Sequence, residues 1–96
     1  MKKLIAVYIL TNYTHSTLYV GMTSDLVGRI WKHRTKFYPD AFTARYNIYY
    51  LVYYEQCENI LAAIEREKQI KHLVRRKNIL LIEKQNPHWE DLYDGL

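Results

Sequence analysis

The chain has 96 residues, of which 49% are hydrophobic and 25% are charged, with 14 Lys and Arg against 10 Asp and Glu. This length and composition predict a single folded domain over residues 1–96 and exclude a disordered chain. No apolar run approaches the roughly 20 residues of a membrane span, so we expect no membrane association. Cys57 is the single cysteine and favours a reducing, cytoplasmic location.

The N-terminal segment predicts a β-hairpin. Residues 3–11 are apolar and β-branched, as in a buried strand, and the start of the chain lacks the long apolar core and cleavage site of a signal peptide. A polar loop over residues 12–16 leads to a second short strand over residues 17–21. Gly21 is expected to end that strand in a tight turn, where glycine adopts conformations closed to other residues.

A helix should follow the hairpin. Thr23 or Ser24 can cap it, and Asp25 suits its first turn because negative charge is favourable at a helix N-terminus. The helix should end before Pro39. Four residues at helical spacing form its expected inner face: Leu26, Ile30, His33 and Phe37.

The second half of the chain predicts one strand and two more helices. Residues 40–47 read as a polar loop and residues 48–55 as the third strand, whose direction stays open. A long helix is expected over about 58–76 and a shorter one over about 77–85, which Pro87 would break. The order β-β-α-β-α-α predicts an α+β domain with a three-stranded mixed or antiparallel sheet flanked by helices.

Arg29 and His33 are the first candidate site residues. They are four residues apart, so they share one face of the first helix, at the border of its apolar stripe. A solvated arginine and a structural histidine are the ordinary interpretations of such positions. The alternative is a pair that binds phosphate.

Glu67 is the second candidate. Most of its neighbours at helical offsets are apolar, so Glu67 should point toward the packed face of the long helix, whereas Glu65 should point away. An inward carboxylate needs a partner. That partner is either a cation such as Lys71 or a hard metal ion, which one carboxylate, waters and a substrate phosphate can hold.

Basic residues gather on the same helix. They can form an ordinary solvated face or a face that contacts the phosphates of nucleic acid. The candidates for phosphate contacts on this helix are Lys68, Lys71, Arg75 and Arg76, and Lys32 of the first helix and Arg45 of the 40–47 loop are added to them.

These segments together resemble the GIY-YIG endonuclease superfamily. The resemblance covers nearly the whole chain, with a motif core over about 3–80. The tail over 81–96 is similar to the small single-domain bacterial, UPF0213-like branch. Four segments carry the motif core: Val7-Tyr8-Ile9, Tyr19-Val20-Gly21, residues 22–33 and residues 63–71.

The resemblance implies a metal-dependent endonuclease that cleaves DNA. By motif position, Tyr8 and Tyr19 are its paired active-site tyrosines, and one of them helps to activate water. Arg29 would stabilise the charge on the phosphate, and His33 would assist proton transfer or hold a phosphate. Glu67 would bind one Mg²⁺ or Mn²⁺ ion.

The resemblance also implies an active-site asparagine. Asn86 suits the small-protein branch and is the first choice, and Asn78 suits the spacing of the repair-nuclease branch.

The implied substrate is DNA, branched, damaged or duplex, bound with low sequence specificity. RNA is an alternative substrate, because nothing in the sequence indicates recognition of a 2′-OH or a base edge. A homodimer or a protein partner would strengthen substrate binding, and the activity could be associated with the nucleoid. A non-catalytic nucleic-acid-binding module on the same fold is the main alternative, and a protein-interaction domain with exposed tyrosines is a third.

Overall fold

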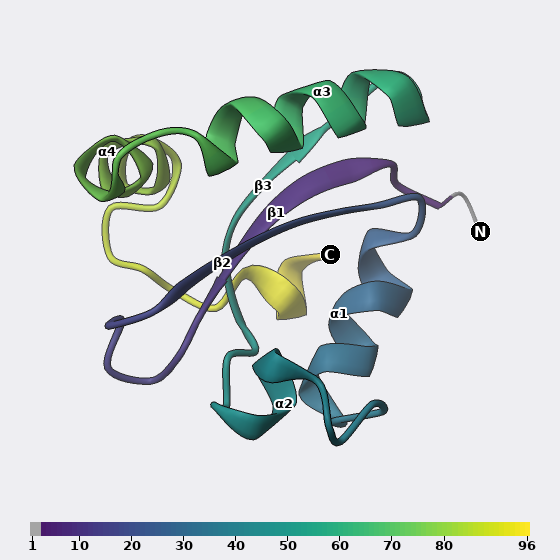
Figure 1. Cartoon of the computed structure of the whole chain (residues 1–96), viewed down its shortest axis with the longest axis vertical. Coiled ribbons are helices and arrows are strands. Elements are labelled where there is room, and N and C mark those ends of the chain that lie inside the picture. The colour runs from purple at the N-terminus through teal and green to yellow at the C-terminus, as the bar shows by residue number, and fades with distance from the viewer. Residues whose placement is uncertain (1–2) are drawn as a thin grey trace.

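A computed structural model describes residues 3–96 as a three-stranded antiparallel sheet with helices on both faces (Figure 1). The predicted α+β fold and the order β-β-α-β-α-α of its main elements are confirmed, and the third strand is antiparallel. Met1 and Lys2 of the expected domain lie outside the described residues. The elements are β1 Ala6–Thr11, β2 Leu18–Thr23, α1 Leu26–Arg34, α2 Phe42–Arg45, β3 Tyr50–Gln56, α3 Ile60–Lys71, α4 Arg75–Gln85 and the 3₁₀ helix η1 Leu92–Gly95.

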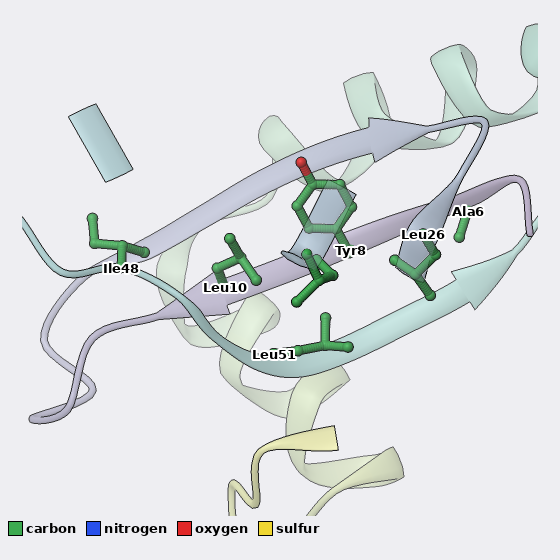
Figure 2. Close-up of a cluster of buried hydrophobic side chains, with 7 residues drawn as sticks. Ala6, Tyr8, Leu10, Leu26, Ile48 and Leu51 are labelled. Carbon is green, nitrogen blue, oxygen red and sulfur yellow. The ribbon is translucent and has the colours of Figure 1, made fainter. Parts of the chain in front are cut away.

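The central strand β1 is buried on both faces because the sheet order is β2-β1-β3. Alternate side chains of a strand point to opposite faces. Ala6, Tyr8 and Leu10 therefore pack toward α1 (Figure 2), whereas Val7 and Ile9 pack toward α3 and α4. The two helical layers are visible in Figure 1, with α3 and α4 on one side of the sheet and α1, α2 and η1 on the other.

Gly21 lies inside β2 and does not end it. It pairs with Tyr8 of β1, and none of the glycines in the described part of the chain has a positive φ, so the predicted tight turn is wrong. The glycine is needed for a close approach instead. A Cβ atom at position 21 would lie 2.5 Å from the phenol oxygen of Tyr8, which packs over this backbone.

The ends of α1 also differ from the prediction. Asp25 itself caps the helix, since its side chain accepts a hydrogen bond from the Gly28 N–H at 3.2 Å, and Thr23 in turn accepts one from the Asp25 N–H. The helix ends at Arg34, so Phe37 leaves the inner face and is 52% exposed. The short helix α2 lies within residues 40–47, where a loop was expected.

The predicted long helix breaks earlier than expected. The helix α3 ends at Lys71, and α4 begins at Arg75. The break between them therefore comes before residue 76, where it was expected. The turn lets Ile70 at the end of α3 and Ile82 of α4 enter the same core cluster. The longest helix described over residues 3–96 has 12 residues, and none there is able to span a bilayer.

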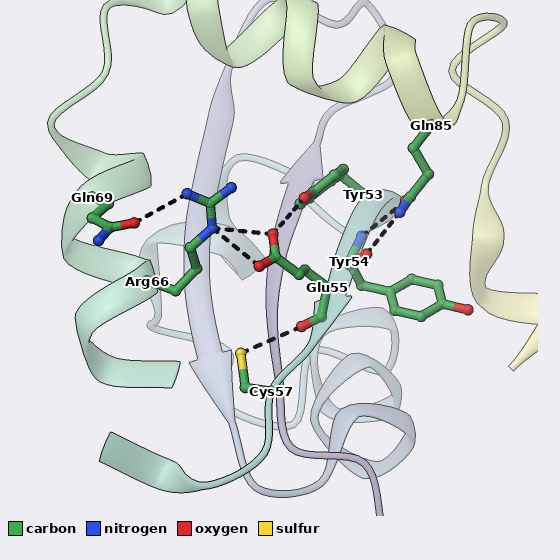
Figure 3. A network of polar contacts seen from close by, with 7 residues as sticks. All are labelled: Tyr53, Tyr54, Glu55, Cys57, Arg66, Gln69 and Gln85. Carbon is green, nitrogen blue, oxygen red and sulfur yellow. Dashed lines mark hydrogen bonds and ion pairs between the residues drawn. The ribbon is translucent and has the colours of Figure 1, made fainter. Parts of the chain in front are cut away.

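The outer edge of β3 is covered by side chains from the C-terminal segment. Gln85 accepts a hydrogen bond from the Tyr54 N–H at 3.3 Å and donates one to the Tyr54 carbonyl at 2.9 Å (Figure 3). Asp91 accepts from the Leu51 N–H at 3.3 Å. These contacts satisfy backbone groups that an edge strand otherwise leaves open.

Candidate active site

Two tyrosines and a histidine meet on the α1 face of the sheet. Tyr8 reaches from β1 over Gly21, and its phenol oxygen lies 3.1 Å from Nε2 of His33. Tyr19 of β2 lies on the same face, because it pairs with Leu10, two residues along β1. The ring of His33 contacts both tyrosines edge-on, with centroid distances of 5.8 Å to Tyr8 and 5.9 Å to Tyr19.

The surroundings of His33 hold it neutral. Burial, together with the nearby positive charge of Arg29, lowers the pKa of His33 to about 4. Its second nitrogen, Nδ1, lies 3.0 Å from the hydroxyl oxygen of Thr43 in α2. A neutral imidazole has one donor and one acceptor nitrogen. Nδ1–H can thus donate to Thr43 while Nε2 stays free to accept a proton from Tyr8.

Tyr8 keeps its proton at neutral pH. Burial raises the pKa of the Tyr8 phenol, the adjacent Tyr19 and the Glu67 carboxylate raise it further, and the Arg29 guanidinium opposes the rise. Glu67 comes from α3, on the opposite side of the sheet, and α3 packs against β2. Residues predicted from three separate segments are brought together here, on β1, β2 and α1.

The helix-face argument for Glu67 is confirmed. The Glu67 side chain is only 20% exposed, whereas Glu65 is exposed. Nζ of Lys71 lies 3.5 Å from Oε1 of Glu67. Lys71 is thus the cationic partner that was one of the two alternatives from the sequence.

Glu67 can also serve as a metal ligand. Within residues 3–96 no three His, Cys, Asp or Glu side chains gather as a metal-binding group, so protein ligands alone would not cage an ion. A hard divalent cation fits a single carboxylate, because Mg²⁺ retains several waters and takes further oxygens from substrate phosphates.

A cavity of about 290 Å³ opens beside the histidine. Tyr19, Arg29 and His33 line it together with the cations Lys32 and Lys36. The exposed Arg29 lies one helical turn before His33 on α1. The cavity therefore presents positive charge and hydrogen-bonding groups at one place, which suits a phosphate.

Comparison with known proteins identifies the family of this chain. Residues 4–79 match the family model of the GIY-YIG catalytic domain. The chain belongs to the GIY-YIG family. It is 35% identical over 81 residues to a UPF0213 protein of Syntrophus aciditrophicus, and the match covers 84% of this chain and 91% of the relative.

The fold is similar to that of a solved structure as well. The NMR structure of a UPF0213 protein from Bacillus halodurans superposes with a TM-score of 0.57 at 29% identity, covering 91% of this chain and 90% of the other. These matches place the GIY-YIG domain of this chain in a family of nucleases that act on DNA and confirm its resemblance to the UPF0213 branch.

The two candidate asparagines of the GIY-YIG domain differ in their surroundings. Asn86 is buried at the end of α4, where its amide donates to the carbonyls of Val52 and Glu90 and accepts from the Glu90 N–H. Its polar atoms are thus used in holding the C-terminal segment to β3, the strand at the opposite edge from β2. Asn78 is also buried on α4, and its Oδ1 has no hydrogen-bond partner within the described residues.

The predicted phosphate-binding cations fall on two surfaces of the GIY-YIG domain. Lys68, Lys71, Arg75 and Arg76 are exposed along α3 and α4, and Arg75 donates to the His15 carbonyl at 3.0 Å. Lys32 and the exposed Arg45 belong to α1 and α2, on the cavity side. Arg66 is not available to either surface, because it pairs with Glu55 at 3.1 Å (Figure 3).

Sequence reasoning missed Thr43 and Lys36 in the GIY-YIG domain. Thr43 fixes His33, but it lies in α2, which was expected to be a loop, and no motif marks it. The available signal was indirect: a histidine at an apolar helix edge needs polar partners for both nitrogens. Lys36 lines the cavity just beyond the end of α1.

Proposed function

We propose that this GIY-YIG domain is a divalent-metal-dependent endonuclease that hydrolyses phosphodiester bonds in DNA. The observation that supports this most is the meeting of Tyr8, Tyr19, Arg29 and His33 on one face of the sheet, together with an inward Glu67 on α3, the helix that packs against β2. A module that only binds nucleic acid needs a cationic cavity but not an inward carboxylate.

Each residue has a role that follows from its position. A divalent ion held by Glu67 would supply charge neutralisation at the phosphate oxygens. The Arg29 guanidinium, exposed at the cavity, stabilises the additional negative charge that develops on the phosphate in the transition state. Tyr19 lines the same cavity and orients the phosphate.

Tyr8 and His33 provide a path for the proton of the attacking water. The protonated Tyr8 passes its own proton to Nε2 of His33, 3.1 Å away, as its oxygen accepts one from water. The charge of Arg29 lowers the pKa of His33, and a bound phosphate offsets that charge. Substrate binding therefore raises the pKa of His33 and makes Nε2 a better proton acceptor. Thr43 positions the ring for this transfer.

The cation surfaces on α3–α4 and on α1–α2 would hold the flanking phosphates. Contacts of this kind give salt-sensitive binding with little sequence preference. We propose branched or damaged DNA in repair or recombination as the substrate. We also propose that a homodimer or a protein partner extends the surface that contacts DNA.

The test is a cleavage assay on a labelled panel of single-stranded, duplex, flap and four-way-junction DNA. It is run with Mg²⁺, with Mn²⁺ and with EDTA, for the wild type, Glu67→Ala and Glu65→Ala. We expect metal-dependent cleavage by the wild type and by Glu65→Ala, and none by Glu67→Ala. Glu65 is the matched control because it is the same residue on the exposed face of the same helix. An equal loss of cleavage in both variants would contradict the role of Glu67.

Arg29→Ala separates catalysis from binding. We expect a larger fall in the cleavage rate than in DNA affinity, because the interaction strengthens in the transition state. A pure binding defect would contradict this role.

A non-catalytic nucleic-acid-binding module is the second candidate. The ion pair between Lys71 and Glu67 favours it, because that pair satisfies the inward carboxylate without a metal. Salt-sensitive DNA retention by both wild type and Glu67→Ala, with no cleavage by either, would establish this function.

A further inference from the structure

The segment over residues 31–46, from the second half of α1 to just beyond α2, displays large aromatic rings to solvent. Contiguous exposed apolar surface of this kind marks an interaction site. The five rings, with their exposed fractions, are Trp31 (48%), Phe37 (52%), Tyr38 (60%), Phe42 (54%) and Tyr46 (55%).

These rings are interleaved with cations. Nζ of Lys32 lies 5.4 Å from the centroid of the Phe37 ring and 6.0 Å from that of Tyr38, and the Arg45 guanidinium lies 5.9 Å from the centroid of Tyr46. Asp40 is the only carboxylate in residues 31–46. Rings that offer flat faces beside cations match the surfaces that bind single-stranded nucleic acid, where bases stack on rings and phosphates contact the cations.

The aromatic surface is continuous with the active site. Tyr38 and Phe42 line the same cavity as Arg29 and His33, with Lys32 at its wall. At about 290 Å³, the cavity is at the low end of the roughly 300–1,000 Å³ of small-molecule sites. A cavity of this size suits a single nucleotide better than a base pair.

We infer that this cavity binds the unpaired nucleotide that flanks the scissile phosphate, with its base stacked on Tyr38 and Phe42. The inference rests on the proposed function, because Arg29 and His33 set the position of the scissile phosphate. Lys32 and Lys36 hold the next phosphate, and Lys36 is oriented by a hydrogen bond to Oδ1 of Asn47 at 2.6 Å. A base inside a duplex is already stacked on its neighbours and cannot offer its face to these rings. The preferred substrate therefore has unpaired nucleotides beside the cut, as in a single strand, a flap or a frayed junction.

The test compares DNA binding by fluorescence anisotropy in a Glu67→Gln background, in EDTA and at fixed salt, so that cleavage does not interfere. Labelled single-stranded and duplex DNA of the same sequence are titrated with this protein. The same titrations are repeated with Tyr38→Leu and Phe42→Leu added together, and with Tyr13→Leu added as the control. Tyr13 is 81% exposed and does not line the cavity. The rings at positions 38 and 42 are exposed, so their replacement spares the core.

We expect the single strand to bind more tightly than the duplex. Replacing both rings should weaken single-strand binding by about 5-fold or more, the effect of losing one stacked base, and Tyr13→Leu should not. A 2-aminopurine within the labelled single strand should lose fluorescence on binding, and the double variant should abolish that quenching. Equal affinity for both DNAs, or a single-strand preference that survives in the double variant, would overturn the inference.

The same proteins distinguish this failure from failure of the proposed function. If the wild type cuts duplex and single strand equally well and the two ring replacements change neither rate, the nuclease stands and the cavity inference is wrong. If no DNA is cut but the single-strand preference depends on Tyr38 and Phe42, the cavity inference stands and the nuclease proposal is wrong.

Discussion

A methyl group at position 21 should disturb the active site through Tyr8. In Gly21→Ala the new Cβ would lie 2.5 Å from the phenol oxygen of Tyr8 and 2.6 Å from Cζ, both well inside van der Waals contact. The Tyr8 side chain is 1% exposed, so its ring cannot move away freely. It must shift within the core or push β1 and β2 apart, and either movement lengthens its 3.1 Å contact with His33.

Two opposing effects set the change in stability. Overpacking a buried site costs about 1–3 kcal/mol. Replacing glycine by alanine at an ordinary φ stabilises the fold by about 0.4–1 kcal/mol, because it restricts the unfolded chain. We expect a net loss of about 1 kcal/mol in the free energy of unfolding, which corresponds to a Tm lower by about 4–8 °C for a domain of this size.

Urea denaturation and a DNA cleavage assay on the same preparations check this prediction. We expect the cleavage rate to fall by about 100-fold or more, the typical contribution of a positioned proton-transfer group. Gly95→Ala is the matched control, because nothing lies within 4 Å of a Cβ atom at that position. If Gly21→Ala matched Gly95→Ala in both stability and cleavage, the close approach of Tyr8 to β2 would not be what requires a glycine here.

Three further predictions follow from hydrogen bonds and pKa values. The pKa of His33 is about 4 in the folded protein and 6.5 in the unfolded chain, so its contribution to stability is complete above pH 6.5 and is lost as the pH falls through about 4. Urea titrations at pH 6.5 and pH 4 should show a smaller loss of unfolding free energy for His33→Gln than for the wild type. Thr43→Val should leave Nδ1 of His33 unpaired and cost about 1–3 kcal/mol of unfolding free energy along with cleavage activity, whereas Thr43→Ser, which keeps the hydroxyl, should retain both. Asn86→Ala removes an amide with three hydrogen bonds and should lower Tm sharply, whereas Asn78→Ala removes an Oδ1 without a partner and should affect Tm much less. A loss of cleavage in Asn78→Ala at nearly unchanged Tm would identify Asn78 as the active-site asparagine, and the reverse pattern in the two variants would support Asn86.

Local patterns predicted most of the fold. The β-branched runs identified all three strands, and the helical spacing of apolar residues identified the three main helices, because burial sets both periods. The details that failed depend on tertiary contacts. Asp25 became the cap of α1 once Thr23 was engaged in β2, and Gly21 serves a ring from another strand, which no local turn pattern indicates.

The same distinction applies to the candidate site. The inward position of Glu67 and the outward position of Glu65 followed from helix geometry alone. The contact between His33 and Thr43 did not, because it joins two helices through a connection whose path the sequence leaves undetermined. The cavity with Tyr38 and Phe42 arises from that same path, and no pattern in the sequence marks either ring.

The cover over β3 has a consequence for how copies of this protein meet one another in concentrated solution. An uncovered outer strand invites a neighbouring molecule to extend the sheet, which is a common first step in aggregation. Here Gln85 occupies both the N–H and the carbonyl of Tyr54, and Asp91 occupies the N–H of Leu51. The C-terminal segment thus blocks strand addition at β3, so local opening of that segment, and not unfolding of the whole domain, is the step that would expose this edge of the sheet to self-association.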